Sequence, residues 1–589
     1  MRKIIRFLMC VFSIIAIGLS VIYHENNLKP IIANAEDCYS AETDLINPPT
    51  VVATLESNTQ LQNIIVDEEK PSNIILSMKE NKVVDKNGAV IGIFEEIVAA
   101  LAKQNILSIA RVEEENTADT LITIIQENRL LDLAVASSNS ALIKKVKSAE
   151  GCQHIRGIWY CSATQELSEL VKESNMAYVL VVVLPQSMAT TKNVLYIQAR
   201  FKTVWVALDD ESDINVRHCI NTGTYGLIVK DYGKVYDIYK TYPASRTRSP
   251  FNVAHRGVSN LRPENSLSGV EMAIEKGATH IELDAYISTD NHIIMMHDAS
   301  IDRMTNGSGE IEKMTLEELR QYKLGYLDGF KVVEEDIPTI DDVMLAMKDT
   351  DVILVLEIKS NESRLINVLR EKIEKYNFWS QMVVISFSQA QLKNMKEMIP
   401  EIPTSYLCSV DKSAFPSFFT MMGNLNSSLD LERANETKEF NQFLCDRGIA
   451  CWYWTYPDFY QTYYLNSFGV TGMVNDKAEQ AENCIFYING IHKSNKPTIG
   501  EIVELEAVLY NGETTLLHGK IEYIEETKTS YEIICSYTEE GRTRFTEKYA
   551  INKKFIGCGS TSSYASVVLL FLGCALMERK KLMYKGEKN

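Results

Sequence analysis

The sequence has no excess of basic residues. Its 60 Lys and Arg against 78 Asp and Glu give a formal net charge of −18, which argues against nucleic acid as a partner and against simple electrostatic docking on anionic lipid. Cysteine is also scarce, with 12 in 589 residues and no Cys-x-x-Cys pair, so a disulfide scaffold is excluded. Cys445 with Cys451, or Cys152 with Cys161, could pair in an oxidising compartment, and buried free thiols are the alternative.

Long apolar runs are missing except near the two ends. Within residues 1–35, a basic start precedes a run from Phe7 to Tyr23, which predicts either a secretory signal or a membrane anchor. Residues 562–578 form a second run, followed by the basic stretch ERKK, which is typical of a transmembrane segment; a buried C-terminal helix is the alternative. Positive charge at both ends predicts a protein of the cell membrane whose large middle part is extracellular.

The middle part has the composition of a globular protein, with 46% apolar and 23% charged residues, and its length suits roughly two to four domains. Residues 70–245 alternate strand-like and helix-like segments, which predicts an α/β domain with a parallel sheet and no catalytic set. The proline-bearing stretch from Thr241 to Pro250 predicts a linker. Residues 495–557 contain alternating strands around Asn511-Gly512, a hairpin signal, and predict a small β-rich module.

Polar residues fall at strand ends in the region from 250 to 490. Glu282 and Asp284 stand at alternate positions of one predicted strand, so both side chains point to the same face, and Glu357 with Lys359 repeats that spacing. Each strand is apolar before its polar end, as expected for barrel strands that are covered on both sides. The pattern predicts a (β/α) barrel whose chemistry lies at the carboxyl ends of the strands.

Three carboxylates at one barrel mouth would repel each other unless a cation lay between them. Oxygen ligands without cysteine or a His-x-x-x-His pair favour Ca²⁺ or Mg²⁺ over Zn²⁺, and such an ion can polarise a phosphoryl oxygen. His255 and His297 lie at different strand ends and could act as a general acid and base. Arg256 and Lys359 add positive charge suited to a phosphate. Read singly, each residue could be an ordinary polar strand end.

These motifs together resemble the glycerophosphodiester phosphodiesterase family. The matching segments, in chain order, are HRG (255–257), PENS (263–266), ELD (282–284), HD (297–298), LEIK (356–359), SFS (386–388), WYWTYPD (452–458) and GVTGMVND (469–476). The resemblance implies a TIM (β/α)8 barrel over about residues 250–490. It also implies metal ligands at Glu282, Asp284 and Glu357, and an acid–base pair at His255 and His297.

By the same resemblance, Arg256 and Lys359 contact the phosphate, Glu264 lies close to the metal, and Trp454 lines the site. The implied activity is that of a phosphoric diester hydrolase, which cleaves a small-molecule glycerophosphodiester into glycerol 3-phosphate and an alcohol with one divalent cation, Ca²⁺ or Mg²⁺. A lysophospholipase D-like enzyme or a hydrolase of glycerol-phosphate wall polymers is an alternative. A catalytically inactive surface binding protein is an alternative from another class.

The sequence also contains a candidate internal repeat. TVWVALDD (203–210) and CWYWTYPD (451–458) are both Trp-bearing strands, and each is followed by a Gly-x-x-Gly pair, at Gly223 and Gly226 in one case and at Gly469 and Gly472 in the other. The first α/β region is therefore predicted to be a degenerate, barrel-like copy of the second. The alternative is that any two strand–helix units look alike.

Overall fold

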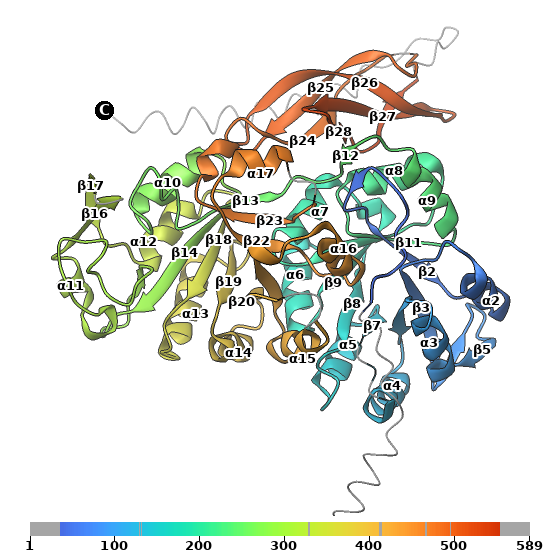
Figure 1. The fold of residues 1–589 in the computed structure, drawn as a ribbon, viewed down its shortest axis with the longest axis horizontal. Helices are drawn as coiled ribbons and strands as arrows, with labels where there is room; N and C mark the ends of the chain where they lie inside the picture. Colours follow the sequence, from blue (N-terminus) through green and yellow to red (C-terminus); the bar gives the residue numbers. More distant parts are fainter. Residues whose placement is uncertain are drawn as a thin grey trace, which may run out of the picture.

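The computed structural model describes residues 36–553, except 129, 131, 328–329, 411–414, 466–467 and 495. It contains two closed eight-stranded parallel barrels side by side and a β module that lies across both (Figure 1). The predicted fold class is thereby confirmed. The predicted N-terminal and C-terminal hydrophobic segments, 1–35 and 562–578, lie outside the described residues. Among the residues described, no helix is long and apolar enough to span a membrane.

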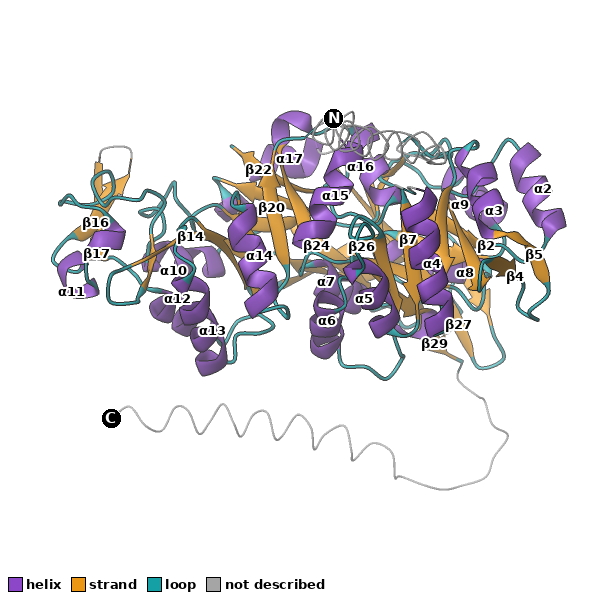
Figure 2. Ribbon diagram, turned by 90° about the horizontal axis from the view of Figure 1, so that it is seen from below, coloured by secondary structure: helices purple, strands orange, loops and turns teal. Residues whose placement is uncertain are grey.

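The first barrel closes by pairing β2 with β3, and its helices cover the outside of the sheet (Figure 2). Its strands are β2 (Thr50–Thr54), β3 (Asn73–Lys79), β6 (Leu107–Arg111), β7 (Leu133–Ser137), β8 (Arg156–Tyr160), β9 (Val181–Pro185), β10 (Thr203–Ala207) and β11 (Gly226–Val229). The hairpin β4 (Lys82–Val84) and β5 (Val90–Ile93) extends β3. The helices are α2 (Asn58–Val66), α3 (Phe94–Ala102), α4 (Glu115–Asn128), α5 (Ser140–Ser148), α6 (Leu167–Met176), η1 (Gln186–Met188), α7 (Thr191–Gln198), α8 (Asp213–Asn221) and α9 (Tyr232–Lys240).

The second barrel repeats this plan and closes by pairing β13 with β14. Its strands are β13 (Phe251–Ala254), β14 (His280–Ile287), β18 (Ile353–Ile358), β19 (Met382–Ser386), β20 (Thr404–Cys408), β21 (Ser428–Glu432), β22 (Trp452–Tyr456) and β23 (Gly472–Asn475). Its helices are α10 (Leu267–Glu275), α12 (Ile340–Met347), α13 (Arg364–Tyr376), α14 (Gln389–Met398), α15 (Phe415–Leu425), η4 (Arg433–Asn435), α16 (Lys438–Asp446), α17 (Phe459–Leu465) and η5 (Ala478–Ala481). Between β14 and α12 it carries an insertion with β15 (Ile293–Met295), η2 (Ile311–Lys313), α11 (Leu316–Leu319), β16 (Lys323–Leu327) and β17 (Phe330–Asp336).

The predicted internal repeat is visible in the strand pairing. In the first barrel Trp205 of the seventh strand pairs with Gly226 of the eighth, and in the second barrel Trp452 pairs with Gly472 in the same way. A Cβ at either glycine would overlap the tryptophan ring, so each pair requires glycine. The two barrels therefore share this pair as well as their strand order.

The barrels pack bottom to bottom through equivalent loops, which precede the seventh strand of each. Asn73, the first residue of β3, donates its amide to the Asp446 carbonyl (2.8 Å), and His280, the first residue of β14, contacts the Ala199 carbonyl through Nε2 (2.8 Å). These loops lie on the boundary between the barrels, where Figure 1 shows α7 and α16. Since active sites of such barrels lie at the opposite end, this contact leaves both mouths free.

Each loop fills the lower core of the other barrel. The ring of Phe201 meets the ring of Trp452 edge to face at 4.8 Å, inside a cluster that includes Phe251 and Val355 of the second barrel. In the opposite direction, the Cys445 side chain packs within the core of the first barrel. Cys445, Cys451, Cys152 and Cys161 are all free thiols.

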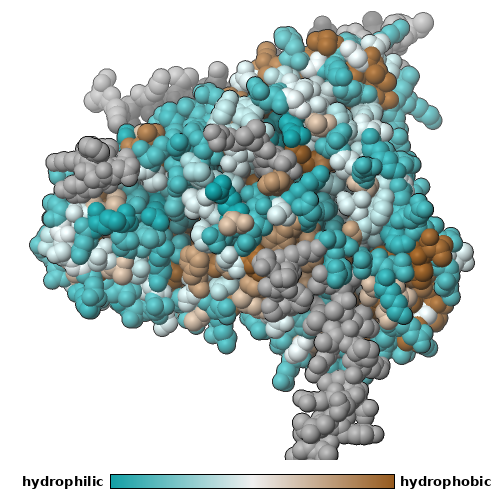
Figure 3. Space-filling view, in the orientation of Figure 1, coloured by the Kyte–Doolittle hydropathy of each residue, from teal (hydrophilic) through white to brown (hydrophobic). Residues whose placement is uncertain are grey.

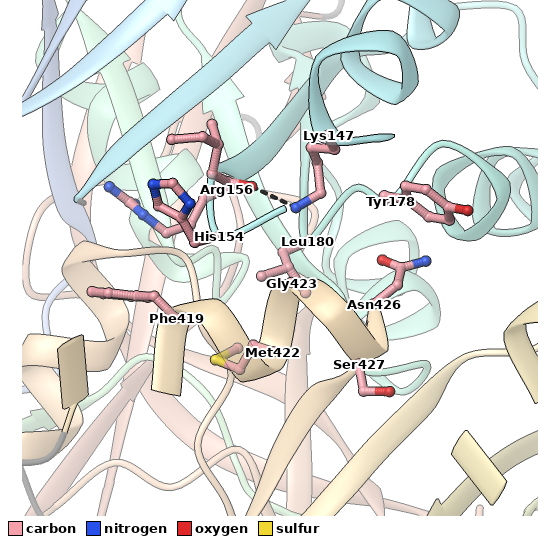
Figure 4. Close-up of a pocket in the computed structure, with 11 residues that line it drawn as sticks. Lys147, His154, Arg156, Tyr178, Leu180, Phe419, Met422, Gly423, Asn426 and Ser427 are labelled. Carbon is pink, nitrogen blue, oxygen red and sulfur yellow. Dashed lines mark hydrogen bonds between the residues drawn. The ribbon is translucent and has the colours of Figure 1, made fainter. Parts of the chain in front are cut away.

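Buried polar contacts complete the interface. Asp132 of the first barrel pairs with Arg156 (3.2 Å) and with Arg447 of the second barrel (2.7 Å), and all three side chains are almost fully buried. Beside them, α5 and the start of β8 pack against α15 (Figure 4). Lys147 donates to the carbonyls of Gln153 and Ile155, and Gly423 of α15 approaches so closely that a Cβ there would overlap the Gln153 carbonyl.

The third sheet contains β24 (Ile485–Gly490), β25 (Ile502–Leu509), β26 (Thr514–Glu526), β27 (Ser530–Glu539), β28 (Arg542–Phe545) and β29 (Tyr549–Asn552). Two short strands from elsewhere join it: β12 (Ser245–Arg246), in the linker between the barrels, and β1 (Leu45–Ile46). The sheet therefore joins the linker and both barrels. The surface seen in Figure 3 is mostly hydrophilic, with hydrophobic residues gathered over this module, where Ile502 and Leu516 are exposed, and at the edge of the first barrel, where Val66 and Val90 are exposed.

Candidate active site

Three carboxylates meet at the mouth of the second barrel. Glu282 and Asp284 point inward from alternate positions of β14, and Asp284 stands opposite Glu357 of the paired strand β18. All three side chains are buried, and each offers an oxygen within 4.8 Å of the others. The predicted convergence of these residues is therefore present in the structure.

The charges in this cluster are unequal. Burial, together with the charges of Asp284 and Glu357, raises the pKa of Glu282 well above its usual range. Burial and the Asp284 charge raise the pKa of Glu357 to about 7. Burial acts on Asp284 in the same direction, but the charge of Lys359 and the hydrogen bond from Asn265 outweigh it, so the pKa of Asp284 lies below its usual range. Carboxylates held so close together favour a bound cation.

Two cationic side chains border the cluster. The Lys359 amine lies 3.2 Å from Asp284 Oδ1 and 3.0 Å from Glu357 Oε1. Arg256, whose backbone is left-handed at φ 55°, donates its backbone N–H to Glu282 Oε2 (2.9 Å). Its guanidinium lies 3.5 Å from Asp284 Oδ2 and bonds Glu264 at 3.2 Å. Both cations are thus held beside the carboxylates, where a phosphate oxygen could be bound.

Asn265, which the sequence reasoning did not select, fixes Asp284. Its amide nitrogen donates to Asp284 Oδ2 and its amide oxygen accepts from the Asp284 backbone N–H, both at 2.9 Å. Asn265 is buried and has a left-handed φ of 59°, a conformation that asparagine tolerates better than most residues. The sequence did contain a signal for this residue, because Asn265 is the third residue of the PENS motif.

His255 follows β13 at the mouth, and its Nδ1 lies 2.7 Å from Asp476 Oδ1, just after β23. This contact brings together the first and eighth strands of the barrel. A proton on Nδ1 held by Asp476 leaves Nε2 available to accept a proton from another group. Asp476 is the last residue of the GVTGMVND motif, and the sequence alone did not indicate its role.

His297 has a similar arrangement on the other side of the carboxylates. Its Nδ1 lies 2.8 Å from Asp298 Oδ1, and Asp298 in turn accepts from Arg303 at 2.6 Å. Arg303 also bonds both oxygens of Glu264, the partner of Arg256. Hydrogen bonds and ion pairs therefore connect His297 to Arg256, and Glu264 acts in this network as a bridge between two arginines.

Trp454 lies on β22 and is half-buried. Its indole nitrogen donates to the Asp430 carbonyl (3.1 Å), and its ring meets that of Phe387 edge to face at 5.5 Å. Phe387 is 52% exposed, so the pair forms an aromatic wall open to solvent. The sequence reasoning missed Asp430, a buried carboxyl whose pKa burial and the charge of Glu357 raise to about 8.

Fold and site together define a (β/α)8-barrel hydrolase with a buried carboxylate cluster and two carboxylate-held histidines. A family model, the glycerophosphoryl diester phosphodiesterase family, matches residues 255–480. The match spans nearly the whole second barrel. The predicted resemblance to this family is confirmed. The predicted enzyme class, a phosphoric diester hydrolase of the glycerophosphodiester phosphodiesterase type, is confirmed as well.

The similar proteins each align with less than half of this chain. A glycerophosphodiester phosphodiesterase of Caldanaerobacter subterraneus subsp. tengcongensis is 36% identical over 162 residues, which are 26% of this chain and 65% of the relative. YhdW of Bacillus subtilis is 28% identical over 234 residues, 38% of this chain and 93% of the relative. Among solved structures, an Oleispira antarctica phosphodiesterase in complex with the product sn-glycerol-3-phosphate is 26% identical, with a TM-score of 0.36, over 39% of this chain and 95% of that one.

Proposed function

We propose that this protein hydrolyses glycerophosphodiesters to glycerol 3-phosphate and an alcohol, and that the reaction depends on a divalent cation. The observation that carries the proposal is the pair of histidines at the mouth of the second barrel, each held through Nδ1 by a carboxylate. Together they border the buried cluster of Glu282, Asp284 and Glu357. The family of residues 255–480 supports the same substrate class.

The carboxylate cluster fits a hard divalent cation, Ca²⁺ or Mg²⁺. Its donors are all oxygen atoms, and Glu282 Oε1 is buried with no hydrogen-bond partner, which leaves one ligand atom unused by the protein. Glu282, Asp284 and Glu357 would hold the ion. When bound, such an ion polarises a phosphoryl oxygen and stabilises negative charge that develops on it.

The histidines supply the proton transfers. With Nδ1–H directed at Asp476, neutral His255 can accept a proton at Nε2, and the Asp476 carboxylate stabilises the imidazolium that forms. His297 has the same relation to Asp298. One Nε2 takes the proton of the attacking hydroxyl, from water or from the glycerol part of the substrate, and the other returns a proton to the leaving oxygen.

The cationic side chains hold the phosphodiester in place. Arg256 and Lys359 are the two positive groups beside the cluster, and both are largely buried, which strengthens their attraction for a phosphate oxygen. The network of Glu264, Arg303 and Asp298 fixes both Arg256 and His297. Trp454, with Phe387, would line the outer part of the site.

We place the catalytic barrel at the outer cell surface, with the protein anchored in the cell membrane. The support is the sequence alone, with basic flanks beside apolar runs near both chain ends. External substrates would then be lipid head-group diesters or fragments of glycerol-phosphate wall polymers. Protease added to intact cells should remove the barrel, and protection until the cells are lysed would contradict this placement.

Release of choline from glycerophosphocholine tests the activity. The full chain should release choline with Ca²⁺ or Mg²⁺ and stop, reversibly, in EDTA. His255→Asn and His297→Asn should each lower kcat at least ~10²-fold. His292→Asn is the matched control, since half-buried His292 is not part of the carboxylate cluster and its Nε2 lies 3.9 Å from Asp290 Oδ2. Undiminished turnover in EDTA would contradict the cation's role. A wild-type protein that binds the cation without turnover on any glycerophosphodiester would favour a surface binding protein.

A further inference from the structure

Three arginines line one small cavity where the linker, the first barrel and the β module meet. Arg246 belongs to β12, Arg248 follows it in the linker, and Arg544 belongs to the neighbouring strand β28, which Figure 1 shows beside β12. The cavity has a volume of about 30 Å³. Its other lining residues are neutral: Thr191, Leu195, Asn221, Thr222, Thr247, Ser249, Phe486, Tyr487, Ile488 and Phe545.

The three guanidinium groups bond only neutral acceptors. Arg246 donates to the Tyr463 carbonyl, and Arg544 donates to Ser249 Oγ (2.8 Å) and to the Tyr463 hydroxyl. Arg248 donates to the Thr224 carbonyl (3.4 Å) and lies over the Tyr225 ring at 4.0 Å. Among the residues that the structure describes, no Asp or Glu forms an ion pair with any of these arginines.

Two acidic residues close to this region have other partners. Glu547 accepts a hydrogen bond from the backbone N–H of Thr191 (3.0 Å), at the rim of the cavity. Glu539 accepts from the Tyr464 hydroxyl (3.3 Å). The barrel interface shows the contrasting arrangement, because there Arg156 and Arg447 share the buried carboxylate of Asp132. None of the described residues that line the arginine cavity carries a carboxylate.

Several buried donors of the cavity-lining residues are left without an acceptor. Arg248 Nε, Arg248 Nη2 and Thr247 Oγ1 are buried and have no hydrogen-bond partner. Arg246 and Arg544 are each only 7% exposed. Burial and the nearby Arg544 charge lower the pKa of Arg246 to about 10, so it is still protonated at neutral pH. Buried positive charge without a counter-charge is costly, and so is a buried donor without an acceptor.

We propose that this cavity binds a small monovalent anion of about the size of chloride. A cavity of about 30 Å³ exceeds the ~10–15 Å³ that a single water needs, yet leaves no room for a sugar phosphate or a nucleotide. The anion accepts from guanidinium groups and offsets their mutual repulsion. Because the arginines come from the linker and from the module, the ion holds these two parts together at the edge of the first barrel. This site is separate from the proposed function, since no residue of the catalytic mouth lines it.

Bromide replaces chloride as the probe in the first test. Crystals of the full chain grown in bromide should show an anomalous scattering peak in the cavity lined by Arg246, Arg248 and Arg544. In solution, the midpoint of thermal unfolding should be higher by about 2–4 °C in sodium chloride than in sodium gluconate at equal ionic strength. No anomalous peak in the cavity, together with equal midpoints in the two salts, would overturn the proposal.

Arg544→Gln and Arg542→Gln form the matched pair. Glutamine at 544 can still donate to Ser249 but removes one charge from the cavity, so both the peak and the difference between salts should disappear. Arg542 lies on the same strand but does not line the cavity, and Arg542→Gln should keep both. An unchanged salt difference in Arg544→Gln would contradict the site. If that variant fails to fold, the wild-type bromide peak and salt difference decide.

Discussion

At the third strand of each barrel, in the same register, the second barrel carries Glu357 and the first carries Arg111. Glu357 pairs with Asp284 across the strands, and Arg111 pairs with Ser77 in the equivalent place. Two residues before Ser77, Ile75 stands where the second barrel has Glu282. The first barrel thus has a positively charged residue, Arg111, at the position where the second has the negatively charged Glu357. Arg111 forms an ion pair with Glu113 at 2.9 Å.

The bottoms of the two barrels differ far less than the mouths. The loop before the seventh strand reads QARFKTVW in one barrel and CDRGIACW in the other. Both contain an arginine five residues before the tryptophan, Arg200 and Arg447. Phe201 and Gly448 occupy the next position, both with left-handed φ of 58° and 67°. The scaffold and its interface were therefore kept in both barrels, while the chemical groups are present in one. The first barrel therefore shares the scaffold of the second but has Arg111 where the second has Glu357.

Exchanging the residues at the third strand should have the largest effect. Glu357→Arg gives the second barrel the residue of the first, removes a proposed ligand and adds repulsion toward a cation, so kcat should fall roughly 10³-fold or more. Arg111→Glu is the reciprocal control and should leave choline release near the wild-type rate. Equal losses in the two variants, with both proteins folded by circular dichroism, would break the distinction between the barrels.

Removing the shared carboxylate of the interface should have the largest effect on stability. Asp132→Ala leaves Arg156 and Arg447 as buried, unpaired charges, which costs about 3–5 kcal/mol in the free energy of unfolding. Urea unfolding of the full chain measures this loss. Glu115→Ala, which breaks the exposed pair with Lys145, should change stability by less than about 1 kcal/mol. A small effect of Asp132→Ala would mean that the interface contributes little.

Phe201→Gly gives the loop of the first barrel the residue that the second barrel has at the equivalent position, Gly448. The ring that packs on Trp452 is lost, which costs about 3–5 kcal/mol for a buried phenylalanine, and glycine recovers about 1 kcal/mol because its φ is left-handed. The expected net loss is about 2–4 kcal/mol in urea unfolding. An unchanged stability would show that the lower core of the second barrel does not depend on the Phe201 ring from the first barrel.

A smaller effect is expected at the contact between the first barrel and the β module. Burial, together with the Lys548 charge, lowers the pKa of His218 from 6.5 to about 4. The folded state therefore binds fewer protons than the unfolded state between these values. Its stability is full above pH 6.5 and is lost as pH falls toward 4, by at most about 3 kcal/mol.

His218→Gln should flatten this part of the stability profile, because glutamine does not titrate. The backbone N–H of Lys548 donates to His218 Nδ1 (3.2 Å), and the glutamine amide oxygen can still accept this hydrogen bond. Chemical unfolding at pH 7 and pH 4.5 measures the difference between wild type and variant. The same loss in both proteins would assign the pH dependence to other groups.

The site was largely predictable from sequence because its residues stand at fixed positions in strands. Alternation placed Glu282 and Asp284 on one face, and the ordered motifs indicated the barrel. Asn265, Asp298 and Asp476 lay inside quoted motifs, but their role is to hold other residues, and such contacts depend on how loops fold together. Arg303 and Asp430 lay outside those motifs, so no local pattern pointed to them.

The long-range architecture was less accessible. The Trp and Gly repeat indicated a second barrel, yet nothing local showed that the two bottoms insert loops into each other, since Asn73 and Asp446 are 373 residues apart. The sequence predicts a small β-rich module over residues 495–557. Its sheet takes in β1 and β12, two-residue strands that are too short to give a period-2 pattern.

Calorimetric titration of the metal-free full chain with Ca²⁺ and with Mg²⁺ tests the central claim most directly. We expect one divalent cation per chain, bound by the second barrel, so that binding is lost in Asp284→Asn and kept in Arg111→Ala. No binding by the wild type, or binding that persists unchanged in Asp284→Asn, would contradict it.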